Sequence, residues 1–449
     1  MTHLSDLSLE VLSVISRFLS SSDILNLSET SKHFHDILYI VKFSDKVEFL
    51  TISASPYFDS FINVTYSKSG CIFPKSMKYL RWNSSEPINP NIPKSVTYIN
   101  LDNEYFRRLP LLPENLTHLK LSDNYYQPIE KLPDLLTHLT LGSNYNVLLP
   151  QLPDSLMYLV LGDCYTWPLV RLPDSLIHLE LSTCYDYSLP SLPTTLKYLD
   201  LGCHYRHQLP ELPDSLVKLK LSALYNHPLP SLPTSLVSLA IGDEYNQSLP
   251  QLPNRLTHLV LFRKLTTLSQ LPNTITHLTL DKHNPALTQL PDSVTHFTIG
   301  FQYYNHPLPK LSNSLTHLRL GYHYNYPLPE LPNSLTHLRL GYHYDYPFLK
   351  LPNSLTHLVL GYNYHKLLPQ LPTHLTHLKL GDSFNELLPL LPSSLTYLEL
   401  GQDYSKALPL LPGSLSKLKV GTSYMLPPDI STKIKIKYHM NSLKKFRNY

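Results

Sequence analysis

The sequence predicts a mostly β solenoid, with one short parallel strand in each unit of about 20 residues. The first observation is the repeat itself: the segment LPNSLTHLRLGYHYDYPFLKL, which begins at Leu331, has a near-copy on either side. The second is a proline that opens each unit and recurs at 20-residue spacing. The third is the spacing Leu-x-x-Leu-x-Leu inside each unit. A fixed period of this size is typical of stacked repeats rather than of separate globular cores.

The proline register sets the limits of the solenoid. The spacing shortens by one residue at Pro272 and Pro291, and Ser312 takes the place of the next proline. With the weaker copies from Pro74 onward, the register gives about 18 units. We therefore predict four parts: a helical module over 1–45, a joint over 46–72 that could hold a strand or two, the solenoid over 73–426, and a C-terminal cap with a basic tail over 427–449.

The amino-acid composition argues against several classes of function for this chain. The net charge of +3 is too small to indicate nucleic-acid binding by itself. Four cysteines in 449 residues do not form a disulfide framework. Cys164 and Cys184 occupy equivalent places in adjacent units and could approach each other, but we expect two buried thiols in a reducing compartment. Without a convincing signal peptide or a long apolar run, we expect no membrane contact and a cytoplasmic location, in the host cytoplasm if the chain is viral.

Each position of the unit has an expected place. In a strand, Leu139 and Leu141 point to the core, and His138 and Thr140 point outward. Gly142 is expected to permit a turn away from the sheet. The return, Leu-Pro-x-Leu-Pro, cannot be helical, since its two prolines favour extended geometry. An aromatic column is expected to fill the core on the return side: Tyr105, Tyr125, Tyr145, Tyr165, Tyr185, Tyr205, Tyr225, Tyr245, Tyr324, Tyr344, Tyr364, Phe384 and Tyr404.

The first 45 residues have no proline and show helical apolar spacing. Their pattern, from Leu7-Ser8-Leu9-Glu10-Val11-Leu12 to Thr30-Ser31-Lys32-His33-Phe34, resembles an F-box, with Ser8 in place of the family's proline. The resemblance implies docking on a Skp-type adaptor of a cullin ubiquitin ligase. The alternative is a helical cap on the first repeat. The adaptor contacts that the resemblance implies are Leu7, Leu9, Leu12, Ile15, Phe18, Leu19, Ile24 and Leu25.

The repeats also resemble a known family. Leu-x-x-Leu-x-Leu at this period is similar to leucine-rich repeats. Tyr225-Asn226-His227-Pro228-Leu229 and its copies at Tyr304 and Tyr324 resemble the FNIP repeat, with Tyr in place of Phe. FNIP repeats follow F-boxes in proteins of social amoebae and of giant viruses that infect amoebae. The units after Pro253 and Pro272 lack the Tyr-Asn pair, and a bend or local defect is expected there.

Two outward columns are candidates for function. A histidine column, of which His317, His337 and His357 are members, is open to three interpretations: a stacked surface ladder, which we favour, a pH sensor, or a metal site. The column two residues later varies from unit to unit, either through neutral drift or because it carries target specificity. Its charged members are the predicted target contacts: Glu180, Asp200, Lys220, Arg319, Arg339 and Lys379.

We find no nucleotide-binding, metalloprotease or Cys-x-x-Cys motif, so we expect neither an enzyme nor a cofactor. Lysines alternate with isoleucines from Lys433 to Lys437, which suits a final edge strand. The resulting hypothesis is a substrate-recognition subunit of a cullin-type (SCF) ubiquitin ligase. Its F-box would bind the host's Skp adaptor, and its repeats would bind an unknown protein. The alternative is a non-enzymatic interaction solenoid whose N-terminal helices are only a cap.

Overall fold

The computed structural model describes residues 43, 45–55, 58–262, 271–281, 289–300, 304, 306–426 and 434–438. The chain divides into two compact parts, an N-terminal half (Met1–Leu216) and a C-terminal half (Val217–Tyr449). The predicted adaptor contacts, the basic tail and much of the two irregular units lie outside the described residues. Within those residues, no helix combines the length and apolar character that crossing a bilayer requires.

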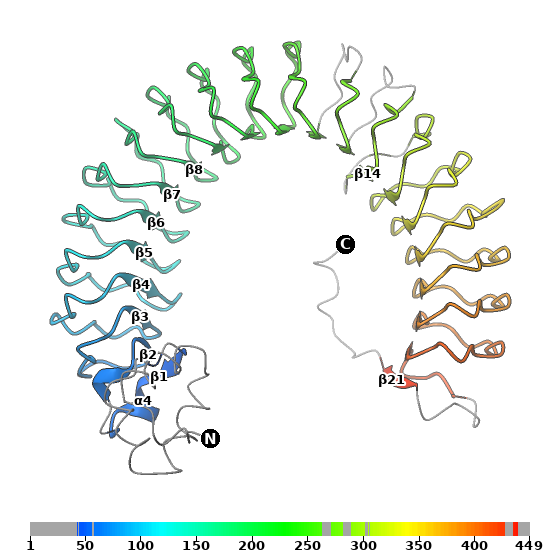
Figure 1. Ribbon diagram of the computed structural model, residues 1–449, viewed down its shortest axis with the longest axis horizontal. Coiled ribbons are helices and arrows are strands. Elements are labelled where there is room, and N and C mark those ends of the chain that lie inside the picture. The colour runs from blue at the N-terminus through cyan, green and yellow to red at the C-terminus, as the bar shows by residue number, and fades with distance from the viewer. Residues whose placement is uncertain are drawn as a thin grey trace, which may run out of the picture. The chain divides into compact units, whose positions relative to one another are not determined.

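The described strands of the N-terminal half each pair in parallel with the next one along the chain (Figure 1). Two short helices, α4 (Phe49–Ile52) and η3 (Phe58–Ser60), lie between the first two strands. These two strands fall in the predicted joint, so parallel stacking begins before the first proline repeat. The strands are β1 (Val47–Glu48), β2 (Asn63–Tyr66), β3 (Tyr79–Trp82), β4 (Tyr98–Leu101), β5 (His118–Lys120), β6 (His138–Thr140), β7 (Tyr158–Val160), β8 (His178–Glu180) and β9 (Tyr198–Asp200).

The C-terminal half repeats this arrangement, and its last strand is the predicted lysine-isoleucine strand. Neighbouring strands align residues one repeat apart, as Leu318 aligns with Leu338. The parallel solenoid that the repeat predicts is therefore confirmed. The strands are β10 (Lys218–Lys220), β11 (Ser238–Ile241), β12 (His258–Leu261), β13 (His277–Leu280), β14 (His296–Ile299), β15 (His317–Arg319), β16 (His337–Arg339), β17 (His357–Val359), β18 (His377–Lys379), β19 (Tyr397–Glu399), β20 (Lys417–Val420) and β21 (Lys435–Tyr438).

The core consists of leucine columns on the strand side and an aromatic column on the return side. Leu136, Leu139 and Leu141 are buried, as are their equivalents in the other repeats. Tyr145 is fully buried, and its ring lies 6.1 Å from that of Tyr125 in a nearly parallel stack. Several of these tyrosines also form a hydrogen bond with the return segment. Their hydroxyls donate to the backbone carbonyl three residues later. The predicted aromatic column is confirmed as core filling.

The return segments are extended, and a tight turn leads each back into its strand. In the turn at Pro332, the amide of Leu335 donates to the carbonyl of Pro332 at 3.1 Å. The hydroxyl of Ser334 donates to the carbonyl of Leu315 in the previous repeat at 2.7 Å. The backbone hydrogen bond therefore closes the turn, and the serine satisfies a carbonyl of the neighbouring repeat.

The strand-end glycines have a different role from the one we expected. Among the described residues only Gly70 and Gly202 adopt positive φ, so Gly142 is not required by its backbone angles. Instead, a Cβ at Gly142 would lie 1.6 Å from the carbonyl oxygen of Ser122 one repeat earlier. Glycine is needed there because successive turns stack in close contact.

The expectation of buried thiols at Cys164 and Cys184 is wrong. Both side chains are exposed, as is that of Cys203. The two cysteines lie in the turns after β7 and β8, where the amide of Cys184 donates to Asp163 one repeat earlier at 3.0 Å. Turns project from the sheet, so they leave small side chains in solvent.

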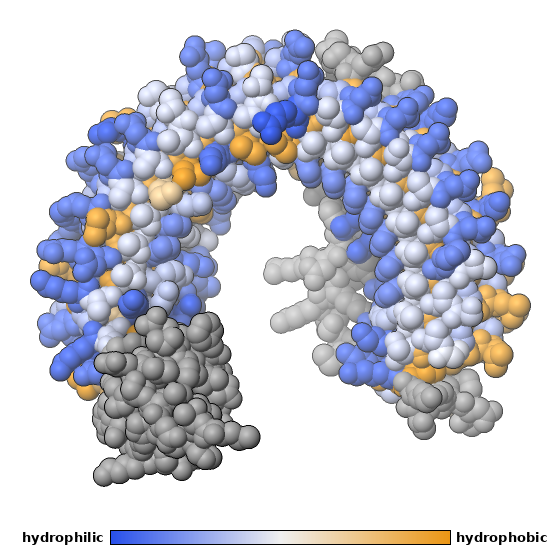
Figure 2. Space-filling model, viewed as in Figure 1, coloured by the Kyte–Doolittle hydropathy of each residue, from blue (hydrophilic) through white to orange (hydrophobic). Residues whose placement is uncertain are grey.

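From β12 to β18 the histidine column forms a continuous stack. We call it the histidine row, and in the C-terminal half it comprises His258, His277, His296, His317, His337, His357 and His377. Neighbouring rings in this half lie 4.1–4.2 Å apart with 11–13° between their planes. Figure 2 shows that one side of the repeats presents a mixed, largely hydrophilic surface. The favoured interpretation, a stacked ladder of half-polar rings, agrees with this geometry.

A threonine before each of these histidines sets the position of its ring proton. The hydroxyl of Thr336 donates to the carbonyl of Thr316 at 3.0 Å and also lies 2.9 Å from Nδ1 of His337. A hydroxyl has one hydrogen, so Nδ1 must donate to the hydroxyl oxygen. Each neutral ring therefore carries its proton on Nδ1 and its lone pair on Nε2.

The glycine contacts predict a stability difference. We expect Gly341→Val to lower the free energy of unfolding by about 2–3 kcal/mol, since its Cβ would lie 1.8 Å from the carbonyl oxygen of Gly321. Gly413→Val is the matched control, because nothing lies within 4 Å of its added Cβ. Urea denaturation of both variants tests this. Equal midpoints would show that close turn stacking does not constrain the position.

The histidine row predicts that stability falls in acid. Burial lowers the pKa of His317, His337 and His357 from 6.5, and neighbouring imidazoles lower it further. The folded chain therefore binds fewer protons than the unfolded chain between the lowered pKa and 6.5. Stability should be complete above that range and decrease as the pH falls through it.

Thermal unfolding between pH 7.5 and 5, compared with a His317→Gln, His337→Gln, His357→Gln triple variant, measures this effect. The variant should show a smaller loss of Tm in acid, because glutamine does not titrate. An equal loss in both proteins would mean that other groups cause the acid sensitivity.

Candidate protein-binding surface

The exposed face of the sheet brings together side chains from many repeats. In β16, the buried Leu338 is flanked by His337 and Arg339, which point to solvent. Pairing in register aligns each exposed residue with its equivalent in the next repeat. A ligand on this face therefore meets two rows: the histidine row, and a variable row made of the residue after each buried strand leucine.

In the N-terminal half, the predicted acidic contacts lie side by side. Glu180 and Asp200 are aligned on β8 and β9. The carboxylate of Glu180 lies 2.8 Å from Nε2 of His178, and the carboxylate of Asp200 accepts the amide of Gly202 at 3.0 Å. Both carboxylates already have hydrogen-bond partners within the chain, which lowers the free energy that a ligand can gain from them.

In the C-terminal half, the predicted basic contacts differ in their exposure and in their partners. Lys220 is exposed on β10. Arg319 and Arg339 are aligned on adjacent strands and half-buried. Lys379 forms an ion pair with Glu399 at 3.2 Å. The structure therefore brings the two arginines together but places Lys379 in a separate cluster.

That cluster was not recognised from the sequence. The Glu399 carboxylate is almost fully buried, and it pairs with Lys379 and Lys419 and accepts the Tyr397 hydroxyl at 2.6 Å. These partners lower the pKa of Glu399 against the effect of burial, which raises it. Glu399 belongs to the variable row. Only the alignment of three neighbouring strands shows that it lies between the oppositely charged Lys379 and Lys419.

Three further lysines extend the basic side of this face. Lys417 takes the histidine place on β20, and Lys435 and Lys437 continue both rows onto β21. The sequence predicts an edge strand for the last two and no binding role. The signal in the sequence is the continuation of the two outward columns of the repeat into these three lysines.

The geometry of the histidine row does not favour a metal site. Among the described residues, no group of three or more His, Cys, Asp or Glu side chains is placed to hold a metal ion. Neighbouring rings lie face to face, so their Nε2 atoms lie beside one another and do not converge. A metal ion needs convergent ligands.

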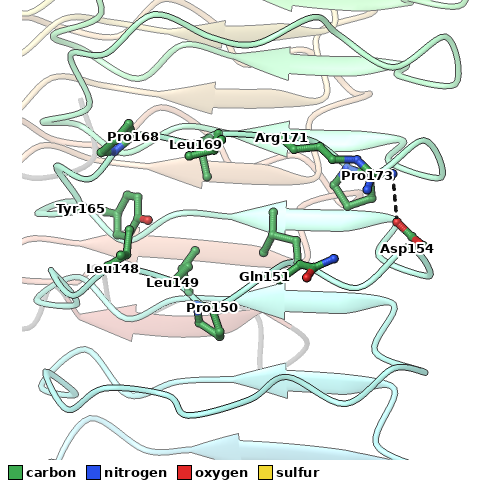
Figure 3. A pocket seen from close by; sticks show the side chains of 12 residues that line it. Leu148, Leu149, Pro150, Gln151, Asp154, Tyr165, Pro168, Leu169, Arg171 and Pro173 are labelled. Carbon is green, nitrogen blue, oxygen red and sulfur yellow. Dashed lines mark hydrogen bonds and ion pairs between the residues drawn. The ribbon is translucent and has the colours of Figure 1, made fainter.

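A small cavity opens on the return side of the N-terminal half (Figure 3). It measures about 350 Å³ and lies between the returns after β6 and β7, where Leu148, Leu149 and Leu169 line it. An ion pair of 3.3 Å joins Arg171 to Asp154 at its edge. The cavity coincides with Val170, which replaces the first proline of the return. This break in the proline pattern was a sequence signal that we did not use.

Comparison with known proteins identifies both parts of the chain. The F-box domain model matches residues 4–46. The FNIP Repeat model matches six segments: 109–144, 225–264, 304–343, 329–363, 344–383 and 362–403. No curated protein matches the chain.

Two solved structures share the solenoid. CroV588, described as a novel circular LRR protein, is 31% identical with a TM-score of 0.65, and the match covers 85% of this chain and 66% of CroV588. The chain thus spans just under two thirds of that protein. YopM from Yersinia enterocolitica WA-314 is 23% identical with a TM-score of 0.52, and the match covers 85% of this chain and 87% of YopM. The second likeness shows the fold alone.

An F-box followed by a leucine-rich-type solenoid is typical of non-enzymatic adaptors that bind other proteins. The exposed sheet face described above is the surface on which this solenoid aligns the side chains of successive repeats. The matches to both domain models, together with the repeat architecture, identify the chain as an F-box and FNIP repeat protein.

Proposed function

We propose that this protein is the substrate-recognition subunit of a cullin-type (SCF) ubiquitin ligase. The F-box match over residues 4–46 carries this proposal, and the parallel solenoid that follows it supports a separate target-binding surface. The F-box binds a Skp-type adaptor, and the exposed sheet face holds a target protein. The chain acts by proximity, because holding the target near a conjugating enzyme raises its effective concentration without chemistry in this chain.

The proposed adaptor-binding residues are the apolar positions of the F-box: Leu7, Leu9, Leu12, Ile15, Phe18, Leu19, Ile24 and Leu25. The proposed target contacts are Glu180, Asp200, Lys220, Arg319, Arg339 and Lys379. These six residues lie on the outward side of the strands. If the protein is viral, the adaptor and the cullin belong to the host, and the protein acts in the host cytoplasm.

Adaptor binding is tested by a pull-down with the full-length chain, probed for a Skp adaptor and a cullin in an amoebal lysate. We expect recovery with the full chain and loss with Leu12→Asp plus Ile15→Asp, because charges on the apolar face of the F-box oppose docking. The matched control is Leu111→Asp plus Leu410→Asp, which adds the same charge at leucines that are 86% and 90% exposed in the solenoid.

A purified Skp adaptor should bind the control variant as tightly as the unaltered chain. Binding to the F-box variant should fall by about a hundredfold, as expected when a buried apolar contact becomes charged. Failure of the well-folded full chain to bind any adaptor would overturn the ligase proposal. The protein would then be an interaction solenoid with a helical cap.

A further inference from the structure

The exposed positions of β15–β21 are strongly basic. On these described strands, seven outward side chains are basic and only Glu399 is acidic. We call this surface the basic face. Its basic members are Arg319, Arg339, Lys379, Lys417, Lys419, Lys435 and Lys437.

The charge is concentrated on this face, although β10 also presents Lys218 and Lys220. The whole chain has a net charge of only +3. In the N-terminal half, the same outward positions carry the acidic Glu180 and Asp200 as well as the basic Arg81 and Lys120. A generally basic composition therefore does not explain the basic face.

The single carboxylate on the basic face does not neutralise it. Glu399 is 5% exposed, and it contacts Lys379 at 3.2 Å and Lys419 at 3.1 Å. One negative charge is thus shared by two lysines, and this cluster keeps a net positive charge. Lys417, Lys435 and Lys437 are exposed nearby on the last two strands.

Strand register brings like charges together. Arg319 is aligned with Arg339, Lys417 with Lys435, and Lys419 with Lys437. Like charges directly opposite each other on neighbouring strands destabilise a sheet. An anionic ligand lying across these strands would reduce that repulsion and gain attraction from several residues at once.

The setting of the aromatic groups favours an acidic protein over a nucleic acid. Single-stranded nucleic acids bind through basic grooves together with exposed aromatic faces on which bases stack. Here the imidazoles of His317, His337 and His357 already stack on one another at 4.1–4.2 Å, so their faces are covered. Tyr397 is held by its hydrogen bond to Glu399. What the face offers a ligand is therefore its arginine and lysine side chains, which suit carboxylates.

We propose that the basic face binds an extended acidic segment, rich in Asp and Glu, of a partner protein. This inference rests on the proposed function, since that partner would be the ligase target. Seven strands at about 4.8 Å spacing span about 29 Å, which an extended segment of about nine residues covers. The charge pattern therefore predicts the chemical class of the target and the length of the segment that is recognised.

The probe is a fluorescent peptide of about nine residues that alternates Glu with Thr, titrated with the purified full-length chain and followed by fluorescence anisotropy. A peptide with Gln in place of Glu is the uncharged control. We expect the Glu peptide to bind, the affinity to fall as salt is raised from 50 to 200 mM, and the Gln peptide to bind at least about tenfold more weakly.

Two charge-reversal pairs locate the site. Arg319→Glu plus Arg339→Glu should weaken binding by about tenfold or more. Lys310→Glu plus Lys350→Glu changes the net charge equally in the same half, but at exposed residues off the strands, and should leave the affinity unchanged. Because the arginines are half-buried, Lys417→Glu plus Lys437→Glu, both exposed, provides a second test that does not disturb packing.

Equal losses in the Lys310/Lys350 pair and in the basic-face pairs would overturn the proposal, since general charge attraction would then explain binding. So would tighter binding of a single-stranded oligonucleotide that displaces the peptide, which would assign the face to nucleic acid. The titration uses no adaptor, so its failure is separate from a failure of the F-box to bind Skp.

Discussion

The structure depends on the in-register parallel pairing of strands that lie one repeat apart. Because Leu338 is aligned with Leu318 and Leu358, each position of the repeat contacts copies of itself. A residue must therefore be compatible with its own neighbour as well as with the rest of its repeat. Leucine and tyrosine meet this condition through packing, and threonine meets it by donating to the preceding carbonyl while accepting from the next imidazole.

The same constraint explains why some positions repeat and others vary. Tyr344 is fully buried between Tyr324 and Tyr364, and a change in ring size would open a void in the column. Gly341 cannot accept a side chain because the previous turn occupies the space. The residue after each strand leucine lies on the outward side of the sheet, and its identity varies from repeat to repeat. A solenoid of this kind separates stability and recognition by position within the repeat.

Recognition then depends on how the variable positions are distributed along the stack. The acidic pair Glu180 and Asp200 lies in the N-terminal half, and the basic face lies in the C-terminal half. Charged side chains are costly to align with like neighbours. The register nevertheless places Arg319 beside Arg339, and the proposed acidic target would use this alignment.

The sequence alone determined the parallel solenoid, the strand positions and the aromatic core, because a 20-residue period with leucine and tyrosine at set places permits few other arrangements. It also placed Arg319, Arg339 and Glu180 on the outward face, since side chains alternate along a strand. Only the tertiary structure decided the distances between repeats. Those distances explain the glycine at position 341, the sharing of Glu399 by two lysines and the cavity beside Val170, because each depends on how closely one turn or strand lies against the next. The tertiary structure also decided the exposure of Cys164 and Cys184, because their turns project from the sheet.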